Sequence, residues 1–187
     1  MDYNYRKLDY EKEKRFQKNV SFQKFNIDME KEKTSFVCQQ NEVGKYGCVN
    51  SQGKVIIPFE YDYLQVCKEG EDAFLEASKE ENSGIIDLDE KIIIPFEYDQ
   101  ISIHKENGKV FLVVEKDEKW GVIDLDKKII IPFDEYDDMV GYETDEKVLL
   151  AVKKNGKWGV IDLSKKIVIP FEFDRFFQIH KKIIDSE

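Results

Sequence analysis

The chain has 187 residues, which is enough for one compact domain or a short repeat array with a hydrophobic core. Hydrophobic residues make up 41% of it and occur in dense, regular clusters, which excludes a disordered chain. The formal net charge of -10 is uneven, because residues 1–33 carry +2 (9 Lys+Arg against 7 Asp+Glu) and the rest carry -12 (20 against 32). An acidic body repels phosphate, so we expect no nucleic-acid partner.

The first residues differ in character from the rest of the chain. Residues 1–24 are highly charged and lack a clean period, and we predict that they form an N-terminal arm or a cap. They contain no apolar core of a secretory signal, and no stretch of the chain approaches 18 apolar residues. We therefore expect a cytoplasmic protein that does not interact with a membrane.

A repeat domain is predicted over residues 25–187. Glycines at 47, 84, 121 and 159 and prolines at 58, 95, 132 and 170 both step by 37, 37 and 38 residues. Two independent markers with one period indicate tandem repeats of about 37 residues. We place these repeats at approximately 34–70, 71–107, 108–144 and 145–182, with a partial leading unit at 25–33.

Each repeat has the pattern of short β-strands. In the fourth, the apolar run 148–152 is followed by Asn155-Gly156, a strong signal for a tight hairpin, and then by a strand over 158–163. A polar turn leads into an Ile/Val triplet that ends at proline, which marks a strand end or a sheet edge. A weaker fourth strand follows, as the alternation of Ile101 and Ile103 indicates. The fold class is therefore all-β, a tandem array of antiparallel β-meanders.

Two arrangements of such an array remain possible. An open, solenoid-like stack accepts any number of repeats, whereas a four-bladed propeller closes on itself and removes the sheet edges. We favour the open stack, because the repeats are short for propeller blades and the partial leading unit disagrees with a count of four.

The repeated sequence resembles a known family. Lys-Trp-Gly-Val-Ile-Asp, followed by Ile-Ile-Pro-Phe-x-Tyr-Asp, is similar to the bacterial WG (KWG) repeat, over roughly residues 34–182. Trp120-Gly121 and Trp158-Gly159 match best, whereas Tyr46 and Ser83 replace the tryptophan in the first two repeats. The resemblance implies an array of variable repeat number and carries over no catalytic residue.

The repeat markers are predicted to have structural roles. We expect the tryptophans to pack one repeat against its neighbour and the glycines to allow close backbone approach. These structural positions are Tyr46, Gly47, Pro58, Gly84, Pro95, Trp120, Gly121, Pro132, Trp158, Gly159 and Pro170.

The remaining reactive residue types suggest no catalytic or metal site. The acidic elements at 60–62, 97–99, 134–137 and 172–174 are expected to be solvated turn residues rather than calcium ligands. His104 and His180 have no partner motif. An odd cysteine count argues against disulfides, and Cys38 and Cys48 fit small core positions. We therefore expect no enzyme activity and no cofactor.

Three functions remain open for this array. The first is a non-catalytic protein-interaction scaffold with a protein partner, for which the divergent second repeat suggests a binding surface at Glu69, Glu71 and Asp72. The second is a small acidic inhibitor or immunity-type protein that binds a basic partner. The third is a carbohydrate-binding or enzymatic module built on exposed aromatic residues.

Overall fold

The computed structural model describes residues 25–26, 35–69, 72–144 and 147–179. The arm or cap predicted for residues 1–24 lies outside these residues. The chain divides into two compact units, Met1–Glu60 and Tyr61–Glu187.

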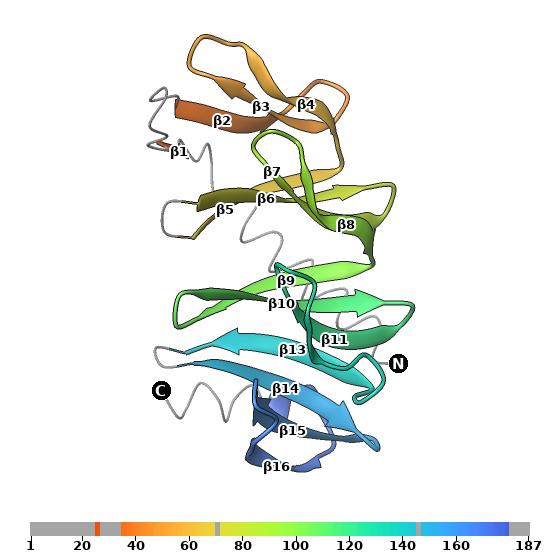
Figure 1. Cartoon of the computed structure of the whole chain (residues 1–187). Helices are drawn as coiled ribbons and strands as arrows, with labels where there is room; N and C mark the ends of the chain where they lie inside the picture. Colours follow the sequence, from red (N-terminus) through yellow and green to blue (C-terminus); the bar gives the residue numbers. More distant parts are fainter. Residues whose placement is uncertain (1–24, 27–34, 70–71, 145–146, 180–187) are drawn as a thin grey trace. The chain divides into compact units, whose positions relative to one another are not determined.

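Four antiparallel sheets make up the structure, and each is a meander of four strands that are consecutive in the chain (Figure 1). The first sheet contains β1 (Phe25–Asn26), β2 (Ser35–Gln40), β3 (Tyr46–Asn50) and β4 (Val55–Tyr61). The second contains β5 (Tyr63–Glu69), β6 (Asp72–Lys79), β7 (Asn82–Asp87) and β8 (Ile92–Tyr98). The third contains β9 (Gln100–Glu106), β10 (Lys109–Lys116), β11 (Lys119–Asp124) and β12 (Ile129–Ile131). The fourth contains β13 (Asp138–Glu143), β14 (Val148–Lys154), β15 (Lys157–Asp162) and β16 (Ile167–Phe173).

Sheet boundaries are shifted relative to the repeats read from the sequence. The weaker fourth strand expected at the end of a repeat pairs forward, so that β9, for example, hydrogen-bonds to β10 and is the first strand of the third sheet. The chain passes from one sheet to the next within the repeated acidic elements, at Asp62, Asp99 and Asp137. Pro58, Pro95 and Pro170 lie in the edge strands β4, β8 and β16, and Pro132 directly follows the edge strand β12, as expected of a residue that cannot donate to a ladder.

The third sheet is buried on both faces within the second unit. Leu112 and Val114 of β10 pack in a core cluster shared with the second sheet, whereas Val113 between them packs in a cluster shared with the fourth. Successive side chains of a strand point to opposite faces, so a continuous apolar run is what a doubly covered strand requires. Sheets two to four thus form an open stack in chain order, with no closed barrel among the described residues. The prediction of an all-β repeat array is confirmed.

The last sheet is covered on its outer face by a helical turn over residues 176–179. Ile179 is fully buried in a cluster with Ala151 and Trp158, and the ring of Phe176 lies 5.1 Å from that of Trp158. This turn takes the position in the repeat that forms the first strand of a sheet elsewhere, and so caps the fourth sheet.

One prediction about the first sheet is wrong. Cys38 of β2 and Cys48 of β3 form a disulfide with Cα atoms 3.9 Å apart, rather than two separate core thiols. The loop 41–45 is one residue longer than its counterpart in the third sheet, so Cys38 corresponds to Val113 and lies directly opposite Cys48. At the fixed spacing of the repeat, Cys38 would correspond to Leu112 instead, so the sequence period does not indicate this pairing.

Candidate functional site

The predicted binding residues lie at the connection between β5 and β6. Glu69 and Asp72 form the last backbone pair of these two strands. Glu71 and the side chains of Glu69 and Asp72 lie outside the described residues. Their role in binding a partner stays a prediction.

The repeat markers are in structural positions. Trp120 is 9% exposed and belongs to the cluster between the third and fourth sheets, together with Tyr136 and Met139. At Gly121, an added Cβ would lie 3.0 Å from the carbonyl oxygen of Ile131 and 3.0 Å from the ring of Phe133. An added Cβ would lie 2.8–3.1 Å from the same two groups, the isoleucine carbonyl and the phenylalanine ring, at Gly47, Gly84 and Gly159.

Tyrosine and phenylalanine side chains join successive repeats in the second unit. Tyr98 stacks on Phe133 with ring centroids 6.5 Å apart, and Tyr136 stacks on Phe171 at 6.4 Å. Tyr98 and Tyr136 are 6% and 8% exposed, and burial raises the pKa of Tyr136 to about 12. The two tyrosines are therefore interface residues and not open platforms for sugars.

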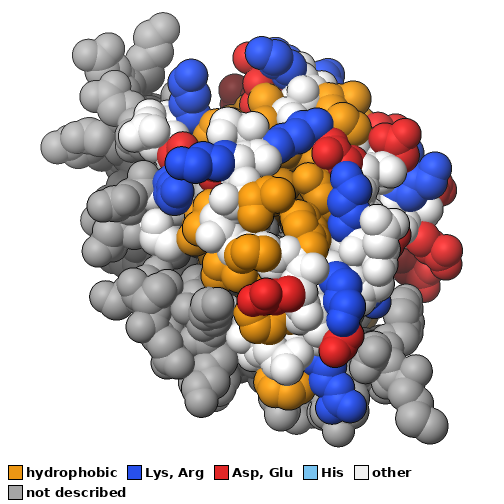
Figure 2. Space-filling view, turned by 90° about the horizontal axis from the view of Figure 1, so that it is seen from below, with side chains coloured by type: hydrophobic (Ala, Val, Ile, Leu, Met, Phe, Trp, Pro, Cys, Tyr) orange, Lys and Arg blue, Asp and Glu red, His pale blue; other side chains and the backbone are white. Residues whose placement is uncertain are grey.

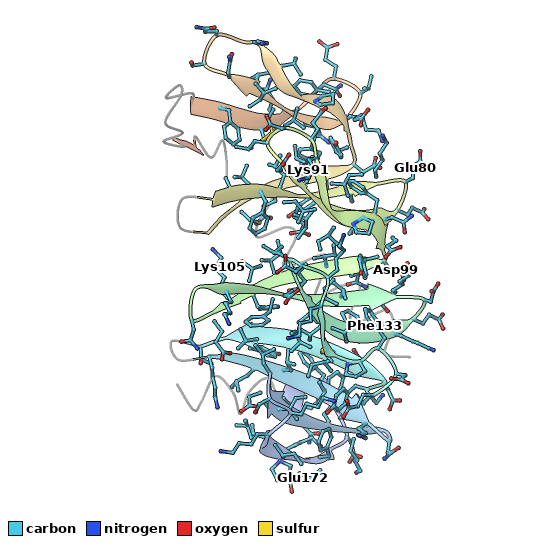
Figure 3. All side chains as sticks on the ribbon, in the orientation of Figure 1. Glu80, Lys91, Asp99, Lys105, Phe133 and Glu172 are labelled. Carbon is cyan, nitrogen blue, oxygen red and sulfur yellow. A yellow bond between two sulfur atoms is a disulfide. The ribbon has the colours of Figure 1, made fainter. Side chains whose placement is uncertain are left out.

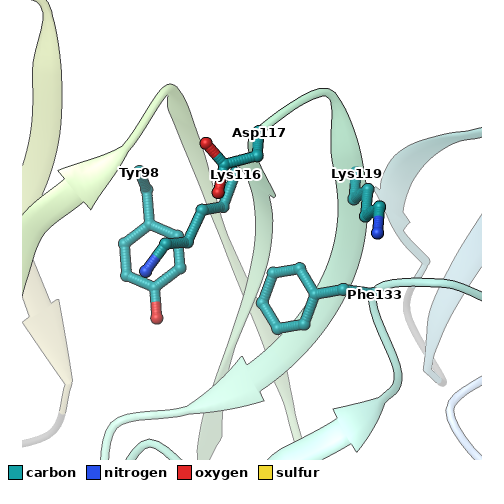
Figure 4. A pocket seen from close by; sticks show the side chains of 5 residues that line it. All are labelled: Tyr98, Lys116, Asp117, Lys119 and Phe133. Atoms are coloured by element: carbon teal, nitrogen blue, oxygen red, sulfur yellow. The ribbon is translucent and has the colours of Figure 1, made fainter.

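A shallow groove of about 330 Å³ lies beside the first of these ring pairs (Figure 4). We call it the hairpin groove, because the β10–β11 hairpin forms one wall; it is lined by Tyr98, Lys116, Asp117, Lys119 and Phe133. Figure 4 shows Lys116 reaching over the ring of Tyr98, with its ammonium 5.8 Å from the ring centroid.

The two lysines of the hairpin groove differ in whether they form an ion pair. The Lys116 ammonium lies 3.1 Å from a carboxylate oxygen of Glu97, and this hydrogen bond raises the pKa of Lys116. The backbone N–H of Asp117 donates to the carboxylate of Asp99, which fixes the hairpin tip. Lys119 is exposed and pairs with no carboxylate among the residues that the structure describes.

A second feature is a set of exposed isoleucines, which we call the isoleucine row: Ile92, Ile129 and Ile167, the first residues of β8, β12 and β16. Each is 56% exposed. Val55 at the same repeat position in the first unit is 49% exposed. In the fourth sheet Val168 is also exposed, at 41%. Figure 2 shows hydrophobic side chains gathered on the face seen there, bordered by charged ones.

Rigid turns present the isoleucine row. The Asp162 carboxylate accepts hydrogen bonds from the N–H groups of Ser164 and Lys166 and from the Ser164 hydroxyl, and the last of these bonds lowers the pKa of Asp162 most. Asp87 accepts from the N–H of Asp89 and of Lys91, the residue before Ile92 (Figure 3). Turn roles were predicted for other acidic residues but not for Asp87 and Asp162, although an aspartate at this place in the second, third and fourth repeats is a signal for it.

Other reactive groups have structural surroundings. Burial raises the pKa of the Cys67 thiol to about 12, so it is protonated at neutral pH. His104 is buried, and its Nε2 lies 2.8 Å from the Ser102 hydroxyl. No group of three or more His, Cys, Asp or Glu residues that could hold a metal occurs in the described part of the chain. Nor does any described helix have the length and apolar character to cross a membrane.

The comparison with protein families agrees with this architecture. The model of the WG containing repeat matches residues 46–70, 84–120, 120–158 and 158–183, which together cover most of the chain. The chain belongs to the WG repeat family. Three matched segments begin at the tryptophan position, at residues 46, 120 and 158, and the other begins one residue after it, at Gly84. These starting points lie within β3, β7, β11 and β15 and not at a sheet boundary. A search of curated proteins found no match.

Proposed function

We propose that this WG repeat chain is a non-catalytic protein-interaction scaffold. The observation that carries the proposal is the isoleucine row, in which successive repeats expose the same apolar side chain at the same strand position. Single exposed apolar residues are common on protein surfaces. An exposed apolar residue that recurs at the same strand position in successive repeats supports a binding surface for a partner.

The fold itself does not require isoleucine at these positions. A strand start favours β-branched residues, and threonine would satisfy that preference without exposing apolar area. Covering about half of each isoleucine side chain by a partner would contribute about 1 kcal/mol per site. The three sites of the isoleucine row, all in the second unit, would together contribute a substantial part of the binding free energy.

The two alternatives find less support. A carbohydrate module would need open aromatic rings, whereas the tyrosines at the repeat junctions are at most 8% exposed. An acidic inhibitor would bind through carboxylates, whereas a pair of lysines directly precedes Ile129 and another directly precedes Ile167 in the sequence, at 127–128 and 165–166. The surface chemistry around the row therefore favours the scaffold.

Site-specific photo-crosslinking in cells of the native host tests the proposal. Benzoylphenylalanine replaces Ile129 in one variant and Val43 in the control, because Val43 is 81% exposed but lies in a loop outside the row. We expect a discrete protein adduct from position 129 and none from position 43. Equal labelling at both positions, or none at 129, would refute the scaffold function of the row.

A further inference from the structure

The third and fourth repeats differ in how they fill the space beside the β-hairpin. In the fourth, β16 runs on to Phe173, which pairs with Trp158, and Asp174 follows with its carboxylate 2.5 Å from the Lys157 ammonium. The pairing lowers the pKa of Asp174. A carboxylate that follows an aromatic residue thus satisfies the lysine at the start of β15.

In the third repeat the corresponding residues, Tyr136 and Asp137, have no described pairing with β11. Its sequence Pro132-Phe133-Asp134-Glu135-Tyr136-Asp137 has one residue more than the fourth, and β12 ends at Ile131. The described pairing of β12 with β11 stops at Val122↔Ile131. The inserted carboxylate turns towards the fourth sheet, where Glu135 accepts a hydrogen bond from Lys165 at 2.6 Å.

Lys119 is the counterpart of Lys157 and is left beside the hairpin groove. Figure 4 shows its ammonium next to the ring of Phe133, on the side away from Tyr98. Its surroundings therefore combine an aromatic floor with a cation that has no ion pair among the described residues. Asp117 is the one carboxylate among the described residues that line the groove, at the place where the fourth repeat has neutral Asn155.

We propose that the hairpin groove binds an extended segment of a partner protein in which an acidic residue follows an aromatic one. The acidic side chain pairs with Lys119, as Asp174 pairs with Lys157 within the chain, and the aromatic side chain lies against Phe133. This inference deepens the scaffold function and rests on it for the nature of the partner. It adds a recognition site of defined charge that does not use the isoleucine row.

The probe for the test is a synthetic peptide that reproduces residues 169–174, Ile-Pro-Phe-Glu-Phe-Asp, with blocked ends. It is titrated into the full ¹⁵N-labelled chain while the amide signals are followed. We expect binding with a dissociation constant of about 0.1–1 mM, typical of a short peptide, with shifts centred on residues 116–119. A peptide with asparagine in place of the final aspartate should bind about fivefold more weakly, since it loses the ion pair.

Three variants make the test specific. Lys119→Glu should weaken peptide binding about tenfold. Lys157→Glu, at the position already paired with Asp174, should leave it unchanged, and Asp117→Asn should strengthen it about twofold by removing the opposing charge. The Asp117→Asn variant gains binding, so loss of folding cannot explain its result.

The outcomes separate this proposal from the scaffold function. Absence of peptide binding, or binding that is insensitive to Lys119→Glu, would overturn the groove assignment and leave the crosslinking result at Ile129 unaffected. Self-association of the chain that Lys119→Glu abolishes would assign the groove to a second copy and equally overturn the proposal. Ile129→Ser should not change peptide affinity, because Ile129 does not line the groove.

Discussion

Ile129 and Ile131 lie two residues apart on β12, yet one is 56% exposed and the other is fully buried. Ile92 and Ile94 on β8 show the same contrast. The buried position is explained by stacking, since Ile131 belongs to the cluster that joins the third and fourth sheets. The exposed position gains nothing from that stacking. One strand therefore carries a residue that holds the array together and another that is available to a partner.

The largest effect on stability is expected when the buried isoleucine of this pair, Ile131, is truncated. Ile131→Ala should reduce the free energy of unfolding by about 3 kcal/mol, because it leaves a cavity between two sheets. Ile129→Ala should cost less than about 1 kcal/mol, as expected of a largely solvated side chain. Urea denaturation of both variants checks this, and equal losses would show that the two positions are not different in kind.

A second substitution disturbs the packing next to the buried isoleucine. Gly121→Ala places a methyl group 3.0 Å from the carbonyl oxygen of Ile131, so backbone or ring must shift, at a cost of about 1–3 kcal/mol. Lys119→Ala on the same strand is the control and should be nearly neutral. Thermal unfolding of both variants measures the effect, and a neutral Gly121→Ala would mean that the close approach is not required.

A substitution that stabilises the array without changing the exposed or the buried isoleucines sharpens the comparison. The two-residue hairpin loop Glu80–Glu81 has φ of 53° and 71°, values that suit the Asn-Gly found at 155–156. Replacing Glu80–Glu81 by Asn–Gly should raise the free energy of unfolding by about 1 kcal/mol. Crosslinking from position 129 should be unchanged; a weaker adduct would indicate that binding depends on overall stability.

The smallest effect concerns the inserted carboxylate of the third repeat. Its hydrogen bond with Lys165 lowers the pKa of Glu135 below the ordinary 4.5, so this stabilisation is present above that pH and disappears as the pH falls through the lowered value. Glu135→Gln should therefore cost under about 1 kcal/mol at pH 7 and nothing at low pH. Denaturation at pH 7 and pH 3 provides the measurement, and a loss equal at both would contradict the ion pair.

Periodicity in the sequence was enough to predict the repeats, the strands and their stacking, because glycine, proline and the apolar runs each report a local backbone requirement. Proline at 132 indicated a strand end or a sheet edge, and the apolar run from 148 to 152 indicated a strand. The tryptophans could be assigned to packing for the same reason, since a repeated residue in a stack meets a repeated neighbour.

The surfaces could not be predicted in the same way. Within an Ile-Ile-Ile triplet, the exposed and buried members are identical in sequence, and only their places along β12, on either side of its register shift against β11, distinguish Ile129 from Ile131. The hairpin groove depends on a one-residue insertion near Glu135, whose effect is to end a strand early. The Cys38–Cys48 disulfide was missed because a longer loop changes the cross-strand register.

The most direct test of the central claim is a triple variant in which Ile92, Ile129 and Ile167 are all serine. Its free energy of unfolding and its capture of the partner crosslinked at position 129 would be measured side by side with the native chain. We predict that unfolding changes by no more than about 1 kcal/mol while partner capture is lost. A large loss of stability, or capture at the native level, would show that the isoleucine row is not a binding surface.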